Sequence, residues 1–510
     1  MLIPGGSYNP QRHFGWTGAV TDPGGSQQPD DPSQPVPQYF AQLARWVPVA
    51  DVLGGTDAMR SKADRYLPRL PREDDQCWNT RISRSVVSPY LHRLILAAVG
   101  LILRKPIQLE DASDYWLEWA ENVDREGTDL QEFASKALYN SLAYGHHGML
   151  VDFPASDART LAEEVQSQAR PYLIQVPCFE TIGWRQQVQQ NMGKLQQLRI
   201  REYTTEDDGR FGSKVIQQIR VLEPGRWEVW RESTNRSGWE LYDQGTTSLT
   251  DIPYVACYSN REGVLVSRPP LAEIAQLNIQ HYSLQAQLLH CLAVAAHPLL
   301  VLRGWDDQAD DLANLSVGNA LAMPPEGGVE YVEPASSAFG AQQQELANLE
   351  EQMSSLGVTI LAKQKNAAES GLSKQLDRAD SNSMLARLSQ ELEQTLQAAV
   401  NWAAEYSGQE PPTVVIDRDF DHERFQGDMI TSLTNLYTNG LLDKETTLKI
   451  LQFGEVIPPE FDVEEIMSAA EVEELDQMEM GLEKQEAQME LSAKYDQPGQ
   501  NNFKQPPSNE

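Results

Sequence analysis

The sequence from Asp251 to Gly304 reads DIPYVACYSN REGVLVSRPP LAEIAQLNIQ HYSLQAQLLH CLAVAAHPLL VLRG. A short apolar strand ends in a polar loop, and the pair Pro269–Pro270 then opens a long helical segment that stops before Pro298. A proline in the first helical turn costs no hydrogen bond, whereas a proline after the last turn ends the helix. The spacing therefore predicts a helix over residues 270–297, followed by a β-rich run.

The second half of this expected helix is apolar on nearly every side. From Leu288 to Ala296 the sequence is LLHCLAVAA. A helix that is apolar all round is packed between other helices, either in a large core or in an oligomer. We expect neighbouring subunits to cover this surface, through Leu288, Leu289 and Leu292.

Hydrophobic periodicity divides the rest of the chain into helical and β segments. Between residues 171 and 258 the period approaches two, with turns such as Asp208-Gly209, which predicts an antiparallel β-lobe. Gly357–Leu361 breaks the pattern of one long helix, and Ser373 is the candidate N-cap of the next. Two more strands are expected, at 149–153 and 413–416. The expected helices cover residues 38–53, 86–103, 130–144, 270–297, 339–356, 373–406, 422–438, 444–452 and 463–484.

The amino-acid sequences of several segments resemble those of one family, the portal proteins of tailed bacteriophages. Their order is kept over roughly residues 60–460, which makes coincidence an inadequate explanation. One departure is Ala368–Gly371, where the family pattern would place a Thr-Ala pair, so the conformation of this loop is open. The segments are RYLPRL (65–70), AVGLILRKP (98–106), YGHHGMLVDFP (144–154), ARPYLI (169–174), IPY (252–254) and PPLAEIAQLNIQHY (269–282).

The resemblance implies an α+β, portal-type fold with long stem helices, a helical and β wing, a small α/β clip and a helical C-terminal crown. Such chains assemble into a ring, twelvefold in this family. The implied divisions are a flexible arm (1–36), wing (37–268), first stem helix (269–298), clip (299–335), second stem helix (336–356), tunnel loop (357–372), long wing helix and strand (373–420), crown (421–490) and disordered tail (491–510).

The same resemblance implies where partners bind. The tunnel-loop residues Lys363, Gln364, Lys365 and Asn366 would touch DNA phosphates in the channel; the alternative is an ordinary solvated loop. The clip residues Arg303, Trp305 and Asp306 would face terminase or a head–tail adaptor. Other implied partners are double-stranded viral DNA, further copies of the chain, and the major capsid and scaffolding proteins. The implied location is the portal vertex of the virion, after assembly in the host cytoplasm.

The chain is strongly acidic, with a formal net charge of −33 and a pI near 4.6. Tight nucleic-acid binding needs lysine and arginine to displace phosphate counterions, so a repressor or clamp is disfavoured. An acidic wall repels phosphates and suits a conduit through which DNA slides. The simple alternative is that the acidity only keeps the protein soluble.

Sequence motifs for catalysis are absent. The chain has no P-loop, nucleophile elbow, His-Glu-x-x-His or EF-hand signature, and we expect no enzyme activity, metal or cofactor. Adjacent side chains on a strand point to opposite faces, so His146-His147 is not expected to share a metal. His290 and His297 are expected to pack rather than bind a ligand. An acidic turn that could hold a cation, or simply be exposed, contains Asp417, Asp419, Asp421 and Glu423.

Neither disulfides nor membrane spans are expected. Cys77, Cys178, Cys257 and Cys291 are far apart and typical of a reducing compartment. The N-terminus lacks the apolar region of a signal peptide. The apolar runs 91–103 and 284–302 are, respectively, too short and too polar to cross a bilayer. Two alternative functions remain open: a nucleic-acid-processing enzyme with an unrecognised acidic metal site, and another head–tail structural protein.

Overall fold

The computed structural model describes most of the chain up to residue 453. The chain forms two compact units, Met1–Phe420 and Asp421–Glu510, which are treated separately below. The expected crown begins at the boundary between them. The described residues are 31–71, 73–154, 170–186, 194–233, 238–295, 299–303, 328–332, 336–361, 371–418, 427–438 and 442–453.

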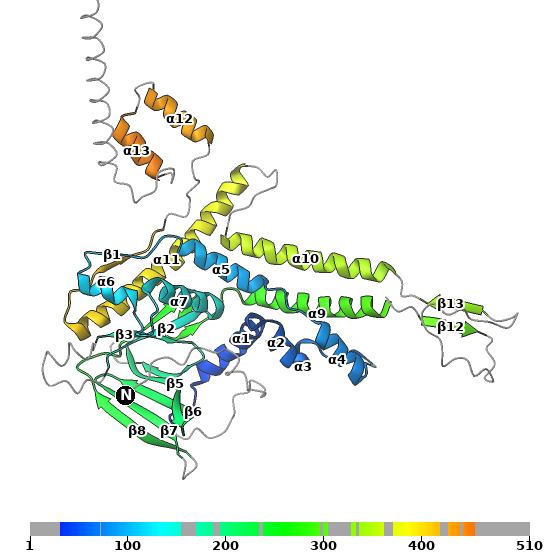
Figure 1. Ribbon diagram of the computed structural model, residues 1–510, viewed down its shortest axis with the longest axis horizontal. Coiled ribbons are helices and arrows are strands. Elements are labelled where there is room, and N and C mark those ends of the chain that lie inside the picture. The colour runs from blue at the N-terminus through cyan, green and yellow to red at the C-terminus, as the bar shows by residue number, and fades with distance from the viewer. Residues whose placement is uncertain are drawn as a thin grey trace, which may run out of the picture. The chain divides into compact units, whose positions relative to one another are not determined.

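The first unit begins with a helical layer (Figure 1). The predicted bounds of α7 are confirmed: Asp129 accepts a hydrogen bond from Glu132 N at 2.6 Å, and Gly145 ends the helix in the left-handed conformation with φ of 96°. The helix predicted from residue 86 begins only at Tyr90, because Pro89 disfavours helical backbone before it. Four short helices, α2, α3, α4 and α6, were not predicted. The layer contains α1 (Pro37–Leu53), α2 (Gly55–Ser61), α3 (Ala63–Tyr66), α4 (Asp75–Arg84), α5 (Tyr90–Ile102), α6 (Asp114–Glu121) and α7 (Leu130–Tyr144).

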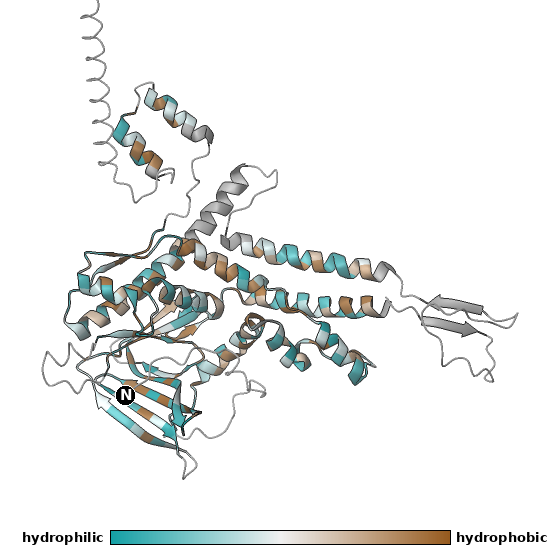
Figure 2. Ribbon diagram, in the orientation of Figure 1, coloured by the Kyte–Doolittle hydropathy of each residue, from teal (hydrophilic) through white to brown (hydrophobic). Residues whose placement is uncertain are grey.

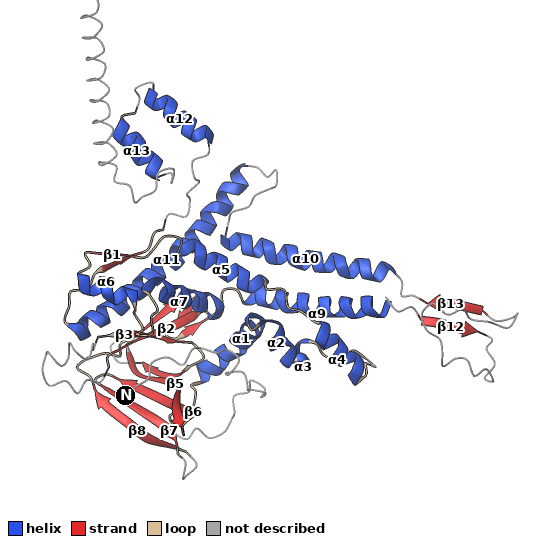
Figure 3. Ribbon diagram, viewed as in Figure 1, coloured by secondary structure: helices blue, strands red, loops and turns tan. Residues whose placement is uncertain are grey.

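Two antiparallel sheets confirm the predicted β-lobe (Figure 3). The three-stranded sheet has the order β3-β2-β9, and β2, predicted to start at residue 149, already begins at His146. The five-stranded sheet has the order β4-β5-β6-β7-β8, and Gly209 and Gly225 take positive φ in two of its hairpin turns. The strands are β2 (His146–Asp152), β3 (Tyr172–Val176), β4 (Thr181–Gln186), β5 (Leu195–Asp208), β6 (Gly212–Glu223), β7 (Arg226–Glu232), β8 (Trp239–Thr246) and β9 (Tyr254–Tyr258).

Residues 31–36, expected to belong to a flexible arm, lie against the five-stranded sheet. Val36 N donates to Ile182 O at 3.0 Å, and Arg199 Nη1 donates to Pro32 O at 3.1 Å. The arm assignment is therefore wrong for these residues, because strand-edge hydrogen bonds hold them. Residues 1–30 lie outside the described part of the chain.

Three long helices follow the sheets: α9 (Ala272–Ala295), α10 (Ser336–Leu361) and α11 (Gly371–Ser407). The predicted break at Gly357 is wrong, since α10 continues to Leu361. Gly357 packs on Leu94 of α5, whose Cδ1 would lie 3.1 Å from an added Cβ, so tertiary packing continues the helix. Ser373 is not the N-cap, because α11 already begins at Gly371. The loop expected at 357–372 is thus shortened at both ends.

Three two-stranded pairings complete the first unit. They join β1 (Gln108–Glu110) to β14 (Thr413–Val415), β10 (Arg261–Gly263) to β11 (Val266–Ser267), and β12 (Leu299–Arg303) to β13 (Gly328–Val332). The strand predicted at 413–416 is therefore confirmed and gains a partner far away in sequence.

One continuous core joins the helical layer, the three-stranded sheet and α11. It contains the fully buried tryptophans Trp46, Trp116 and Trp119, and Leu392 and Leu396 of α11. Figure 2 shows apolar residues alternating with polar ones along these helices. The core reaches along α9 as far as Ala286, and the last turns of the helix extend beyond it (Figure 1).

The second unit is described over two helices, α12 (Gly427–Thr438) and α13 (Lys444–Phe453). The first was predicted from residue 422 and the second over 444–452. The helix predicted at 463–484 lies outside the described residues.

Candidate functional site

The most distinctive feature is the helix pair α9 and α10, which pack side by side (Figure 1). Between them the chain forms β12 and β13, paired in register from Leu299↔Val332 to Arg303↔Gly328. A pair of strands between two neighbouring helices must lie at the end where α9 stops and α10 starts. Arg303 closes β12, whereas Trp305 and Asp306 lie outside the described residues.

A polar contact ties α9 to α10 and α5. His281 Nε2 of α9 lies 3.1 Å from Glu350 Oε1 of α10. The ring of Tyr90 from α5 meets His281 edge-on, with centroids 5.5 Å apart. Burial and the hydrogen bond to Glu350 raise the pKa of Tyr90. The three helices are therefore joined at one point as well as packed.

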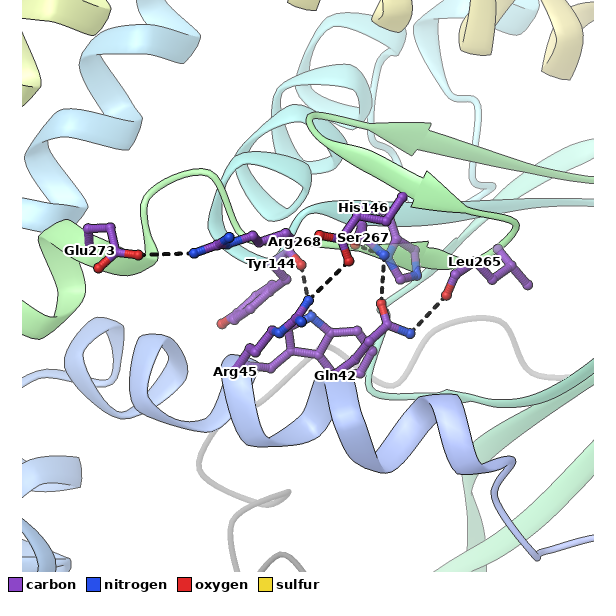
Figure 4. A network of polar contacts seen from close by, with 10 residues as sticks. Gln42, Arg45, Tyr144, His146, Leu265, Ser267, Arg268 and Glu273 are labelled. Atoms are coloured by element: carbon purple, nitrogen blue, oxygen red, sulfur yellow. Dashed lines mark hydrogen bonds and ion pairs between the residues drawn. The ribbon is translucent and has the colours of Figure 1, made fainter.

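The segment just before α9 is held by polar side chains, seen in Figure 4. Gln42 of α1 donates to Leu265 O and accepts from Ser267 N, both at 2.9 Å. The Ser267 hydroxyl lies 2.7 Å from His146 Nδ1 on β2, and Arg268 pairs with Glu273 at 3.2 Å. These bonds fasten the segment before α9 to the helical layer and to the three-stranded sheet.

Further along α9, two more side chains reach the segment between α4 and α5. Asn278 is fully buried and its Nδ2 donates to Ser88 O at 3.0 Å. The Tyr282 hydroxyl lies 2.8 Å from Ser85 Oγ. Helix α4 also packs against α9. Its residue Arg81 binds Glu73 through two hydrogen bonds of 2.7 and 2.8 Å. The body thus holds the first two-thirds of α9 rigidly.

The stem leucines do not share one environment. Leu288 is buried at 7% exposure within the single chain, Leu289 is half-buried, and Leu292 is 39% exposed. Of these three leucines, Leu289 and Leu292 offer apolar surface to another molecule. His297 lies outside the described residues.

The lysine, arginine, aspartate and glutamate content of the helix pair is all of one sign, negative. Neither α9 nor α10 contains a lysine or arginine, and together they carry Glu273, Glu345, Glu350 and Glu351. The surface of this pair is therefore acidic and amide-rich.

His146 and His147 are buried on opposite faces of β2. His146 contacts Ser267, whereas His147 contacts Gln175 on β3. Burial lowers the pKa of His146 to about 3 and that of His147 to about 4. The two rings thus have different surroundings, and the described residues contain no group of three or more histidine, cysteine, aspartate or glutamate side chains that could hold a metal ion.

These histidines predict an acid-sensitive fold. The unfolded chain takes up protons on histidine near pH 6.5, so below that pH it binds more protons than the folded chain. The free energy of unfolding then falls as pH decreases from about 6.5 to about 4, by up to about 1.4 kcal/mol per pH unit per histidine. Glu180 has the opposite effect on the pH dependence. Burial raises its pKa to about 7, so the folded chain takes up this proton first and the free energy of unfolding gains from this group as pH falls.

The variant His147→Gln isolates one histidine. Urea unfolding gives the free energy of unfolding of the parent and the variant at pH 6 and at pH 5. The change of this free energy with pH should differ between the two proteins by about 1.4 kcal/mol per pH unit. Parallel slopes for the two proteins would show that His147 is not held neutral in the folded chain.

The remaining expected site residues are only partly described. Asp417 forms an ion pair with Lys105, which balances its charge without a metal ion. Asp419, Asp421 and Glu423 lie outside the described residues. So do Lys363, Gln364, Lys365 and Asn366, between the end of α10 and the start of α11. All four cysteines are unpaired, as predicted. No helix in the described ranges is long and apolar enough to cross a membrane.

Sequence reasoning missed an ionic cluster at the junction of the two sheets. Arg220 of β6 is buried and lies 2.8 Å from Asp152 Oδ2 of β2 and 2.7 Å from Glu202 Oε1 of β5. The Tyr172 hydroxyl donates to the same Asp152 oxygen at 3.2 Å. Charged residues alternating along strands are typical of a solvent face, so the sequence carried no signal for this cluster.

Comparisons with known proteins add two findings. Residues 270–407 match a family model described as "Domain of unknown function (DUF4055)". This segment runs from the start of α9 to the last residue of α11 and so contains the helix pair, the strand pair and the long helix. Among curated proteins, none matches the chain.

Similar solved structures include chains from gene transfer agent (GTA) particles. One is from "Neck of empty GTA particle computed with C6 symmetry", with a TM-score of 0.38 and 12% identity. Another is from "Virion of native gene transfer agent (GTA) particle", with a TM-score of 0.39 and 11% identity. A third is from "Neck of native GTA particle computed with C12 symmetry", with a TM-score of 0.37 and 11% identity. Each match covers 75% of this chain and 93% of the other.

Proposed function

We propose that this chain is a portal protein: the subunit of a ring at one capsid vertex that admits viral DNA during packaging, retains it, releases it and carries the head–tail connection. The ring acts as a conduit and performs no catalysis. Twelve copies are the number that the family resemblance implies. The proteins it would meet are the terminase large subunit, a head-completion or adaptor protein, and the capsid and scaffolding proteins.

The observation that carries the proposal is the order of α9, β12, β13, α10 and α11. Two packed helices joined through a strand pair would be the stem and clip of a portal, and the long third helix would be its wing helix. The residues between α10 and α11 would be the tunnel loop. The anchoring of α9 through Gln42, Asn278 and Tyr282 supports a stem that projects rigidly from the body.

Electrostatics supports a conduit. The helix pair lacks basic residues, so it offers DNA phosphates no strong counter-charge. Repulsion at close range keeps a polyanion centred, whereas salt screens it within about 10 Å at 0.1 M ionic strength. A channel wall of this kind would confine DNA without holding it.

Partner contacts follow from the same arrangement. Arg303 ends β12, and Trp305 and Asp306 follow it in sequence. As in the clip of a portal, these three residues would face terminase or the adaptor. Tryptophan and arginine are common among residues that dominate interfaces. Lys363, Gln364, Lys365 and Asn366 would meet DNA in the channel.

The oligomeric state tests the proposal directly. Mass photometry of the purified chain at micromolar concentration should show one large species near twelve times 57.2 kDa, and negative-stain images should show rings with a central channel. A chain that stays monomeric over this range would contradict the proposal. Nuclease activity with a divalent cation would support the enzymatic alternative instead.

The tunnel loop gives a second test. The double change Lys363→Ala, Lys365→Ala should leave ring assembly unchanged and should reduce the amount of DNA packaged or retained by about two-fold to ten-fold, since few phosphate contacts are lost. Nuclease-protected DNA per particle is the measurement. The matched control is Lys444→Ala, Lys449→Ala in α13 of the second unit. Equal packaging by parent, variant and control would assign these lysines to an ordinary surface loop.

A further inference from the structure

Helix α5 has an outward face that nothing in the described chain covers. Its exposed residues are Arg93, Leu96, Ala97 and Gly100, which recur at helical spacing, and exposed Arg104 follows just after the helix ends at Ile102. Leu96 is 49% exposed, and a Cβ added to Gly100 would meet no atom within 4 Å. The middle of this face is therefore apolar, with no side chain rising above Gly100, and an arginine lies at each end.

Arg93 is the cation at one end of this face. Among the described residues no carboxylate forms an ion pair with Arg93, although the arginine is exposed. An exposed leucine beside such an arginine is a surface that an apolar and acidic helix would complement. The rest of the molecule offers one such helix.

That helix is α10. Asn348, Glu351, Gln352, Ser355 and Leu356 line an open hollow on its outer side. Leu356 is 43% exposed, and Glu351 forms no ion pair with any described residue. This side therefore combines an exposed apolar residue with a negative charge, which is the complement of the α5 face.

The hollow on α10 points away from α5. On α10, Glu350 contacts Tyr90 of α5 and Gly357 lies against Leu94, so these residues mark the side turned towards α5. Side chains advance by about 100° per residue around a helix. Asn348 and Gln352 are thus each about 160° from Glu350, on the far side. One chain consequently cannot bring its own two faces together.

We infer that, in the ring, the α5 face of one subunit docks on the α10 hollow of the next copy. The inference rests on the proposed ring. Contact between two different patches on identical chains is heterologous, and such contacts generate closed rings when the rotation closes. Leu96 packs against Leu356, Ala97 and Gly100 allow close approach of the helices, and Arg93 pairs with Glu351.

A charge-swap experiment tests the pairing on the full-length chain. Arg93→Glu and Glu351→Arg should each raise the concentration needed for half-assembly by about ten-fold or more, because each places like charges together. An equimolar mixture of the two variants should assemble again, since alternating chains restore a Glu–Arg pair at every contact. Contact within one chain could not produce this rescue.

An apolar variant and its matched control complete the test. Leu96→Asp should block assembly, whereas Leu117→Asp on α6, where the leucine is 52% exposed, should assemble like the parent. If the parent forms rings and the α5 and α10 variants do so equally well, the pairing is wrong and the ring stands. If the parent is monomeric at every concentration, both the pairing and the proposed function fail.

Discussion

Replacing Leu292 by aspartate is expected to give a folded monomer in place of a ring. Leu292 is 39% exposed in the single chain, so the substitution removes little from the fold of the subunit. In an assembled stem the same position would bury an unpaired carboxylate, which costs several kcal/mol, roughly 2–7 even for a neutral polar group. The concentration for half-assembly should then rise by about 100-fold or more. Mass photometry measures the assembly, and circular dichroism checks the fold.

Two neighbouring leucines serve as comparisons. Leu288 is buried within the subunit, so Leu288→Asp should lower the melting temperature of the monomer itself. Half-buried Leu289 should show both effects when changed to aspartate. Rings formed by Leu292→Asp at the parent's concentration would place this part of α9 outside the subunit contacts.

Replacing Arg220 by methionine is expected to cause the largest loss of subunit stability, about 3 kcal/mol. The change leaves Asp152 and Glu202 facing each other without their shared cation. Removing one partner of a buried ion pair typically costs about 3–5 kcal/mol. The low end applies because the two carboxylate side chains keep 21% and 20% of their surface exposed. The urea midpoint of the β-lobe transition is the measurement.

A surface ion pair provides the control for this experiment. Arg226 pairs with Glu223 at 2.6 Å, but its side chain is 57% exposed. Arg226→Met should therefore cost less than about 1 kcal/mol. Adding Asp152→Asn and Glu202→Gln to Arg220→Met should recover part of the loss, because no uncompensated charge remains buried. A loss in Arg220→Met no larger than in Arg226→Met would show that the cluster is solvated.

Local chemistry in the sequence determined many elements correctly. The helix at 130–144 was predictable because its start and stop are local: Asp129 caps one end, and Gly145 accepts the left-handed conformation at the other. Prolines bracket α9 in the same way. Turn residues and a period of two identified the antiparallel lobe, although not the order of its strands.

Other boundaries depended on contacts distant in sequence. The helix α10 passes through Gly357 because this residue packs on Leu94, some 260 positions earlier. The pairing of β1 with β14 and the hydrogen bonds of residues 31–36 to the five-stranded sheet are equally non-local. Periodicity reports the neighbours of a residue along one element, so it cannot report these partners.

The candidate site divides in the same way. Sequence alone determined that α9 is apolar towards its end, that two long helices enclose a β-rich insertion, and that neither carries a basic residue. Only the tertiary structure decided that Leu288 is buried while Leu292 is exposed, and that the hollow on α10 points away from α5. The physical reason is that a helical pattern gives the angle of each side chain about its own axis, whereas exposure depends on which neighbouring helices occupy that direction.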